Sequence, residues 1–142
     1  MATWHQKGSS SARKGLGAMI ILDTNIFIYL AKGVLSSELV ADNDIAHASI
    51  TKIEALGYSR IPANELLLLD ALFNESYGLP LTDAIVELAI KLRQLKQMSL
   101  GDSIVAATAI ENNSTLWTAN TDDFGHIEDL HLYNPLLQSN AP

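Results

Sequence analysis

The chain has 142 residues, 48% of them hydrophobic and 18% charged, which suits one globular domain and argues against an intrinsically disordered chain. Cysteine is absent, which excludes disulfides, thiolate zinc sites and cysteine nucleophiles and favours a reducing, cytoplasmic location. The 16 acidic residues outnumber the 9 lysines and arginines, and this net charge of −7 argues against a non-specific nucleic-acid coat, which is usually basic.

The first eighteen residues differ in composition from the rest of the chain. They are rich in Gly, Ser and Ala, carry three basic residues and no acid, and lack a periodic apolar pattern. We interpret residues 1–18 as an expression tag or disordered leader and residues 19–142 as one domain; a basic arm that touches RNA is the alternative. Without the leader the chain has 6 basic and 16 acidic residues, and its net charge becomes −10.

The first half of the domain alternates between strand-like and helix-like segments. A continuous apolar run at residues 19–22 stops at Asp23 and predicts a strand that is buried on both faces. Further segments follow in chain order: a helix over residues 26–31 that ends near Gly33, a strand over 45–49, a helix over 50–58, and a helix that Pro62 opens and that continues to residue 73.

The second half continues the alternation. Residues 79–81 form a short extended piece, and Thr82 caps a helix whose apolar residues recur at spacings of three and four up to residue 95. A helix of small residues over 102–110, strands over 115–118 and 130–133, and an end of regular structure at Pro135 complete the prediction. This alternation predicts parallel strands with helical crossovers, in a three-layer α/β/α domain. No apolar run approaches the roughly 18–20 residues that span a bilayer, so we expect no membrane association.

Acidic side chains follow the predicted strands, where ligands bind in open α/β sheets. Asp23 follows the first strand, Glu54 lies in the helix after the second, Asp102 begins the small-residue helix, and Asp122 and Asp123 follow the strand at 115–118. Neighbouring carboxylates repel each other, and a divalent cation bound between them would offset this repulsion. Ligation by oxygen atoms alone favours Mg²⁺ or Mn²⁺ over zinc. Taken singly, Asp23 and Asp102 are also explained as helix caps, and the other three as solvated acids.

Five segments of the chain resemble, in order, the motifs of PIN-domain ribonucleases, especially the VapC-type toxins of bacterial and archaeal toxin–antitoxin pairs. They are Ile-Leu-Asp-Thr-Asn-Ile at 21–26, Ser-Ile-Thr-Lys-Ile-Glu-Ala-Leu-Gly-Tyr at 49–58, Asp-Ser-Ile-Val-Ala-Ala-Thr-Ala at 102–109, Thr-Ala-Asn-Thr-Asp-Asp-Phe at 118–124 and His-Leu-Tyr-Asn-Pro at 131–135. Each motif alone is weakly specific, but the match is collinear over residues 19–135.

The resemblance implies a parallel sheet of four to five strands between helices and a Mg²⁺- or Mn²⁺-dependent endoribonuclease. Asp23, Glu54 and Asp102 match the family's acidic triad as metal ligands and catalytic residues, and Asp123 would supply the remaining charge because Asn120 is neutral. Asp122 has no counterpart in the family, and we expect it to be solvated. Four polar residues would orient the carboxylates or water, namely Thr24, Asn25, Thr118 and Asn120.

The family also implies an RNA substrate, a VapB-like antitoxin and a homodimer. Apolar residues at 26–30 and 66–69 occupy more helix faces than one core needs, so they predict the homodimer interface and an antitoxin groove, with simple burial as the alternative. Five basic residues would contact phosphates, with solubility as the alternative; they are Lys52, Arg60, Lys91, Arg93 and Lys96.

None of the four histidines, His5, His47, His126 and His131, matches a catalytic position. This disfavours histidine acid–base cleavage and favours hydrolysis by metal-activated water, which leaves 5′-phosphate and 3′-hydroxyl ends. Two other functions remain open: a PIN-like domain that binds RNA or protein without cutting, and a phosphatase or phosphoacceptor with Asp23 as the nucleophile. The latter lacks the second Asp or the Lys that such enzymes place near the nucleophile.

Overall fold

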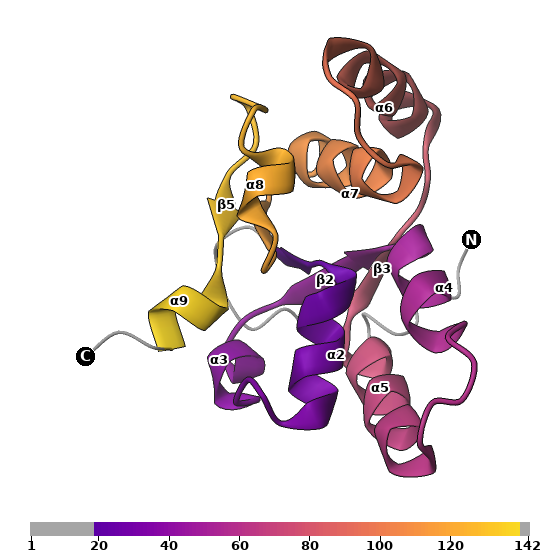
Figure 1. Ribbon diagram of the computed structural model, residues 1–142, viewed down its shortest axis with the longest axis vertical. Coiled ribbons are helices and arrows are strands. Elements are labelled where there is room, and N and C mark those ends of the chain that lie inside the picture. The colour runs from indigo at the N-terminus through magenta and orange to yellow at the C-terminus, as the bar shows by residue number, and fades with distance from the viewer. Residues whose placement is uncertain (1–18, 140–142) are drawn as a thin grey trace.

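The computed structural model describes residues 19–139, so the leader predicted for residues 1–18 lies outside the described residues. A five-stranded, all-parallel sheet with the strand order β3-β2-β1-β4-β5 forms its centre (Figure 1). The strands are β1 (Ile20–Leu22), β2 (Ile45–Ala48), β3 (Tyr77–Leu79), β4 (Thr115–Trp117) and β5 (Leu132–Tyr133). Helices on both faces complete three layers, which confirms the predicted fold class.

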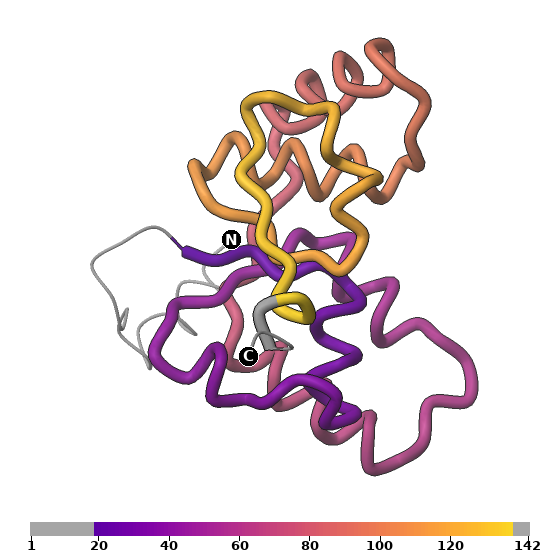
Figure 2. Tube along the Cα trace, turned by 60° about the vertical axis from the view of Figure 1, so that its left-hand side comes forward, coloured from indigo at the N-terminus to yellow at the C-terminus, as the bar shows by residue number. Residues whose placement is uncertain are grey.

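The helices divide into two groups on opposite faces of the sheet (Figure 2). One face is covered by α2 (Thr24–Lys32), α3 (Glu38–Ala41), α4 (Ser49–Leu56) and α5 (Ala63–Glu75). The other is covered by α6 (Asp83–Leu95), α7 (Leu100–Glu111) and α8 (Thr121–Phe124). The last helix, α9 (Pro135–Ser139), packs Leu136 against the first group.

The apolar run at residues 19–22 is continuous because β1 is covered on both faces. Ile21 points into the core beneath α6 and α7, whereas Leu22 points into the core beneath α2 and α5. Both side chains are completely buried. Alternation along a strand sends successive side chains to opposite faces, so a central strand between two helical layers needs apolar residues throughout.

Two predicted helix starts have different outcomes. The Thr82 cap is confirmed, because its Oγ1 accepts a hydrogen bond of 3.2 Å from the Ile85 N–H. The reading of Asp102 as a cap is wrong, since α7 begins two residues earlier and Ser99 is its N-cap. The Ser99 hydroxyl accepts a 3.0 Å hydrogen bond from the Asp102 N–H, which places Asp102 in the first turn.

The predicted end of regular structure at Pro135 is also wrong, because α9 begins there. Proline needs no hydrogen-bond acceptor for its nitrogen, so it is favoured at the first position of a helix. The Asn134 carboxamide oxygen accepts a 3.0 Å hydrogen bond from the Leu136 N–H and caps the new helix.

Strand β3 covers residues 77–79 instead of the predicted 79–81. Its register pairs Ala46 with Tyr77 and Ala48 with Leu79, and Pro80 follows as a residue that cannot donate to a sheet. The short helices α3 and α8 were not predicted. Within residues 19–139, no helix combines the length and the apolar character needed to cross a membrane.

Core packing can be tested at Leu116, which is completely buried between β1 and β5. We expect Leu116→Ala to lower the free energy of unfolding by about 2–5 kcal/mol, because the remaining cavity adds to the lost burial. Leu67→Ala is the matched control, since Leu67 is 71% exposed, and it should cost less than about 0.5 kcal/mol. Urea unfolding of both variants measures this, and equal effects would contradict the assignment of the core.

Candidate active site

Asp23 and Thr118 stand side by side at the carboxyl edge of the sheet, because β1 and β4 are hydrogen-bonded neighbours. The Asp23 N–H donates to the Trp117 carbonyl at 2.9 Å and extends the pairing by one residue. The side chains then meet directly, since the Thr118 hydroxyl donates to Asp23 Oδ2 at 2.8 Å. The Asn120 N–H donates in turn to Thr118 Oγ1 at 3.0 Å and fixes the hydroxyl as a donor toward Asp23.

The second oxygen of Asp23 caps α2. Its Oδ1 accepts a 2.8 Å hydrogen bond from the Thr24 N–H, so the cap and the candidate catalytic acid are the same side chain. Only 7% of Asp23 is exposed. Both oxygens are therefore held in place by neutral donors from two different elements.

Glu54 reaches the same edge from α4. The Thr24 hydroxyl donates a 2.7 Å hydrogen bond to Glu54 Oε1, while the backbone of Thr24 holds Asp23. One threonine at the start of α2 thus connects two carboxylates that are separated by thirty-one positions in the sequence.

Asp102 lies at the other side of the edge, in the first turn of α7. It lines a pocket of about 200 Å³ together with Asp122 and Asp123 of α8 and residues 96–99 of the loop between α6 and α7. Asp122 was expected to be merely solvated, and it is indeed exposed, but the structure brings it to the same pocket. The helical turn of α8 places Asp122 there beside Asp123, and because this helix was not predicted, the sequence indicated only Asp123.

The carboxylates perturb one another. The pKa of Asp23 is raised, mainly by burial and further by the charges of Glu54 and Asp123, against the hydrogen bonds from Thr118 and Thr24. The pKa of Asp102 is also raised, by burial first, then by the charge of Asp23 and more weakly by Asp123 and Glu54, while Ser99 opposes the shift. All four predicted acids therefore lie in one electrostatic neighbourhood, with no cation among the groups that shift these pKa values.

Three further polar residues that the sequence singled out are Asn25, Asn120 and His47. The side chains of Asn25 and Asn120 form no hydrogen bond within the part of the chain that the structure describes, although the Asn120 backbone supports Thr118. His47 is buried, shares a 2.8 Å hydrogen bond with Ser76, and packs its ring against Phe27 and Phe73. It is a packed core residue, away from the acidic side chains of the site.

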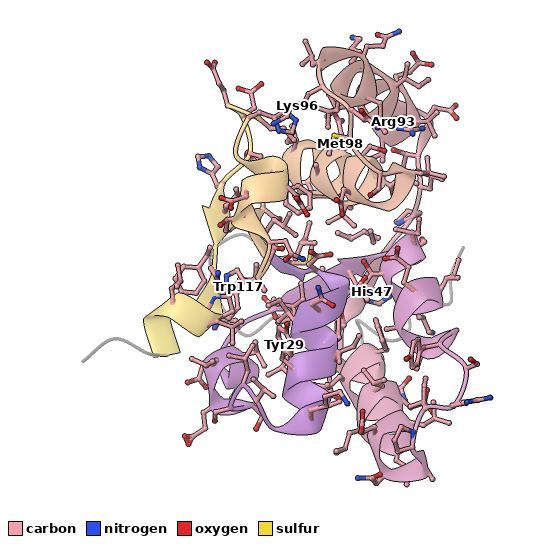
Figure 3. The ribbon with its side chains drawn as sticks, viewed as in Figure 1. Tyr29, His47, Arg93, Lys96, Met98 and Trp117 are labelled. Carbon is pink, nitrogen blue, oxygen red and sulfur yellow. The ribbon has the colours of Figure 1, made fainter. Side chains whose placement is uncertain are left out.

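The five basic candidates divide between the site and the outer surface. Arg93, Lys96 and Met98 lie together where α6 meets α7 (Figure 3). Lys96 lines the acidic pocket, whereas Arg93 Nε donates to the Met98 carbonyl at 3.2 Å and braces the loop. Lys52 lines a separate pocket with His47 and Ser49, and Arg60 and Lys91 are exposed.

Residues 20–130 match the family model described as the PIN domain. The chain belongs to the PIN domain family. No curated protein matches the sequence of this PIN domain.

Several solved structures share the fold of this PIN domain. It is 26% identical to a chain of VapBC2 from Rickettsia felis bound to a DNA fragment from their promoter, with a TM-score of 0.70 and coverage of 82% of this chain and 98% of that one. A toxin–antitoxin complex from Klebsiella pneumoniae matches with 26% identity, a TM-score of 0.68 and coverage of 82% and 97%. The DNA-bound VapBC from Salmonella typhimurium, at 18% identity, a TM-score of 0.68 and coverage of 83% and 98%, shows the fold alone.

The donor chemistry of the PIN domain fits a hard divalent cation. Carboxylate oxygens dominate the site, and the pKa values of Asp23 and Asp102 are raised mainly by burial and further by neighbouring carboxylates, whose repulsion a cation would relieve. Within residues 19–139, no three His, Asp or Glu side chains lie close enough to hold a metal ion as they stand. Glu54 and Asp123 are exposed, whereas Asp23 is buried and held by two hydrogen bonds.

Burial and neighbouring carboxylates raise the pKa of Asp102. We therefore expect Asp102→Asn to stabilise the metal-free protein at pH 7. A carboxyl group whose pKa is raised above its usual 3.8 stabilises the fold while protonated, and that contribution is lost as the pH rises through the raised value. Asparagine does not ionise, so its advantage should be present at pH 7 and shrink below pH 3.8.

Thermal unfolding in EDTA between pH 3 and pH 8 measures this effect, and Asp70→Asn on α5 is the control. A variant that is less stable than the parent at pH 7 would mean that the attraction between Asp102 and the start of α7 exceeds the repulsion.

Proposed function

We propose that this PIN domain is a Mg²⁺- or Mn²⁺-dependent endoribonuclease that hydrolyses RNA phosphodiester bonds and acts in the cytoplasm as the toxin of a VapBC-like toxin–antitoxin pair. One observation carries the proposal. Asp23, Glu54, Asp102 and Asp123 come from four separate elements to one electrostatic neighbourhood, and none of them forms an ion pair within residues 19–139. A domain that only served as a scaffold would have no need to oppose this repulsion.

Asp23, Glu54, Asp102 and Asp123 would hold the cation, which when bound supplies Lewis-acid and water-activating chemistry. Thr118 and Thr24 keep the two oxygens of Asp23 in fixed directions. Thr24 also holds Glu54, so that one residue sets the spacing of two ligands. The donors are neutral, so they orient both carboxylates without placing a positive charge where the cation would bind.

Lys96 would contact an RNA phosphate at the rim of the site, since it lines the pocket that contains Asp102 and Asp123. Arg93 would act indirectly, because its Nε–H already supports the loop at Met98. Lys52, Arg60 and Lys91 remain outer phosphate contacts in this proposal. With few cations, RNA affinity should be modest and recognition should depend on RNA shape.

Apolar surfaces support the proposed protein partners. A groove of about 600 Å³ lies between α2, the segment 33–37 that follows it, and α5, lined among others by Leu30, Leu35, Leu68 and Leu72. An amphipathic helix of a VapB-like antitoxin would lay its apolar face there. The similar structures of VapBC2 from R. felis and of a toxin–antitoxin complex from K. pneumoniae support such a partner.

A second apolar surface supports the homodimer. Val86 and Ile90 of α6 and Leu100 at the start of α7 are exposed beside a pocket of about 320 Å³ between these helices. The sequence indicated residues 26–30 and 66–69 for both partners, and it did not single out this surface. Leu68 lines the groove, whereas Ile26, Phe27 and Leu69 are buried in the core. We therefore assign the groove with Leu30 and Leu68 to the antitoxin and the α6–α7 surface to the second copy.

A domain that binds RNA or protein without cutting is the alternative. It is favoured by the absence, within residues 19–139, of three side chains already close enough to hold a metal ion.

Asp23→Asn distinguishes the two functions. Loss of the central carboxylate should lower Mn²⁺-dependent RNA cleavage by at least about 100-fold, because even residues that only orient metal ligands cost 10–100-fold. Growth inhibition on expression should disappear with it, while far-UV circular dichroism stays unchanged. Asp70→Asn is the control, and a variant at position 23 that remains as toxic as the parent would refute the catalytic proposal.

The product ends give an independent readout of the same reaction. We expect 5′-phosphate and 3′-hydroxyl ends, which can be read by ligation and mass spectrometry. Cyclic-phosphate ends, or full activity of purified protein in EDTA, would contradict hydrolysis by metal-activated water.

Lys96→Gln tests the phosphate contact. RNA binding should weaken several-fold, and the slope of log affinity against log salt should fall by about 0.7, the value for one contact to single-stranded RNA. Lys32→Gln on α2 is the matched control, because Lys32 is not among the proposed phosphate contacts and its Nζ pairs with Glu65 at 3.0 Å. Equal effects of the two substitutions on binding to a single-stranded oligonucleotide would contradict a specific role for Lys96.

A further inference from the structure

Gly101 occupies a helical position at which its backbone does not require glycine. It lies in the first turn of α7, and within residues 19–139 the positive-φ glycine is Gly33, not Gly101. Glycine inside a helix is less favourable than alanine because it loses more conformational freedom on folding. The reason for glycine at position 101 must therefore lie in what surrounds it.

The space that a side chain would take is filled by Glu54. A Cβ atom at position 101 would lie 2.9 Å from Glu54 Oε2, 3.7 Å from Glu54 Cδ and 3.8 Å from Ile50 Cδ1. The first distance is shorter than an ordinary contact between carbon and oxygen atoms. The Glu54 carboxylate thus rests against the bare backbone of α7, one residue before Asp102.

The other oxygen of the same carboxylate is held from the opposite side. Thr24 Oγ1 donates a 2.7 Å hydrogen bond to Glu54 Oε1. Glu54 is an exposed residue with a flexible side chain, and these two contacts, with α2 and with α7, define where its carboxylate lies.

We propose that Gly101 is a positioning residue for the metal site, because its missing side chain lets the Glu54 carboxylate lie against α7 and face Asp23 and Asp102. The inference rests on the proposed function for its effect on metal binding and catalysis. The atom that meets the added Cβ is the far end of a flexible side chain and not backbone. Gly101→Ala therefore displaces Glu54 and leaves the helix in place.

This placement predicts opposite effects of Gly101→Ala on stability and on metal binding. The melting temperature of the metal-free protein should stay the same or rise, because alanine is the better helix former. Mn²⁺ affinity, measured by isothermal titration calorimetry, should fall about tenfold, as for other groups that orient a metal ligand. A fall of several degrees in melting temperature, or an unchanged Mn²⁺ affinity, would overturn the proposal.

A double-mutant cycle with Glu54→Asp separates positioning from a merely additive loss. Aspartate withdraws the carboxylate by one methylene and leaves room for the new Cβ. Glu54→Asp alone should weaken Mn²⁺ binding about tenfold, and adding Gly101→Ala to it should cost little more. An additive loss of about 100-fold in the double variant would show that the two residues act independently.

Crystal structures of the parent and of Gly101→Ala distinguish failure of this inference from failure of the proposed function. If the parent binds no Mn²⁺ and cleaves no RNA, the proposed function fails, and the position of Glu54 alone decides the role of Gly101. Loss of the hydrogen bond between Thr24 and Glu54 in the variant supports that role, whereas an unmoved carboxylate overturns it.

Discussion

Repulsion between carboxylates at the carboxyl edge of the sheet is the constraint on which the rest of the site depends. Burial and neighbouring acids raise the pKa of both Asp23 and Asp102, so ionising these groups in the folded protein costs stability. The fold tolerates this cost because the acids lie on separate elements. Asp23 connects β1 to α2, and the other acids lie in α4, α7 and α8. Each element is fixed by apolar packing that does not depend on the acids.

Neutral hydrogen-bond donors hold these acids in place. Thr118 donates a hydroxyl hydrogen bond to Asp23, and Thr24 donates its N–H to Asp23 and its hydroxyl to Glu54. A lysine or arginine in their place would relieve the repulsion, but it would also neutralise the charge that a divalent cation needs. Neutral donors thus fix the orientation of the carboxylates without neutralising their charge. This combination is expected of a metal site and not of a structural ion-pair network.

Much of the fold and part of the site could be predicted from the sequence. The buried run before Asp23 and the small-residue helix after Asp102 carry strong local patterns, so the strand–acid relationship was visible without coordinates. Gly101 and Asp122 were not, because their roles arise from the approach of α4 to α7 and of α8 to α7. Local patterns also misplaced β3 and the structure after Pro135, where a cap and a register decide the outcome.

The loop from Lys96 to Ser99 links the pocket that Lys96 lines to the first turn of α7, which Ser99 caps. Arg93 braces it at Met98, Ser99 ends it by capping α7, and that cap fixes the turn that carries both Gly101 and Asp102. Lys96, at its start, lines the pocket beside these acids. A displacement of this short loop would therefore move the proposed phosphate contact Lys96, the proposed metal ligand Asp102 and the surface against which Glu54 rests at the same time. In a protein with net charge −7 and few cations near the acids, such coupling lets one supported segment align substrate and ligands together.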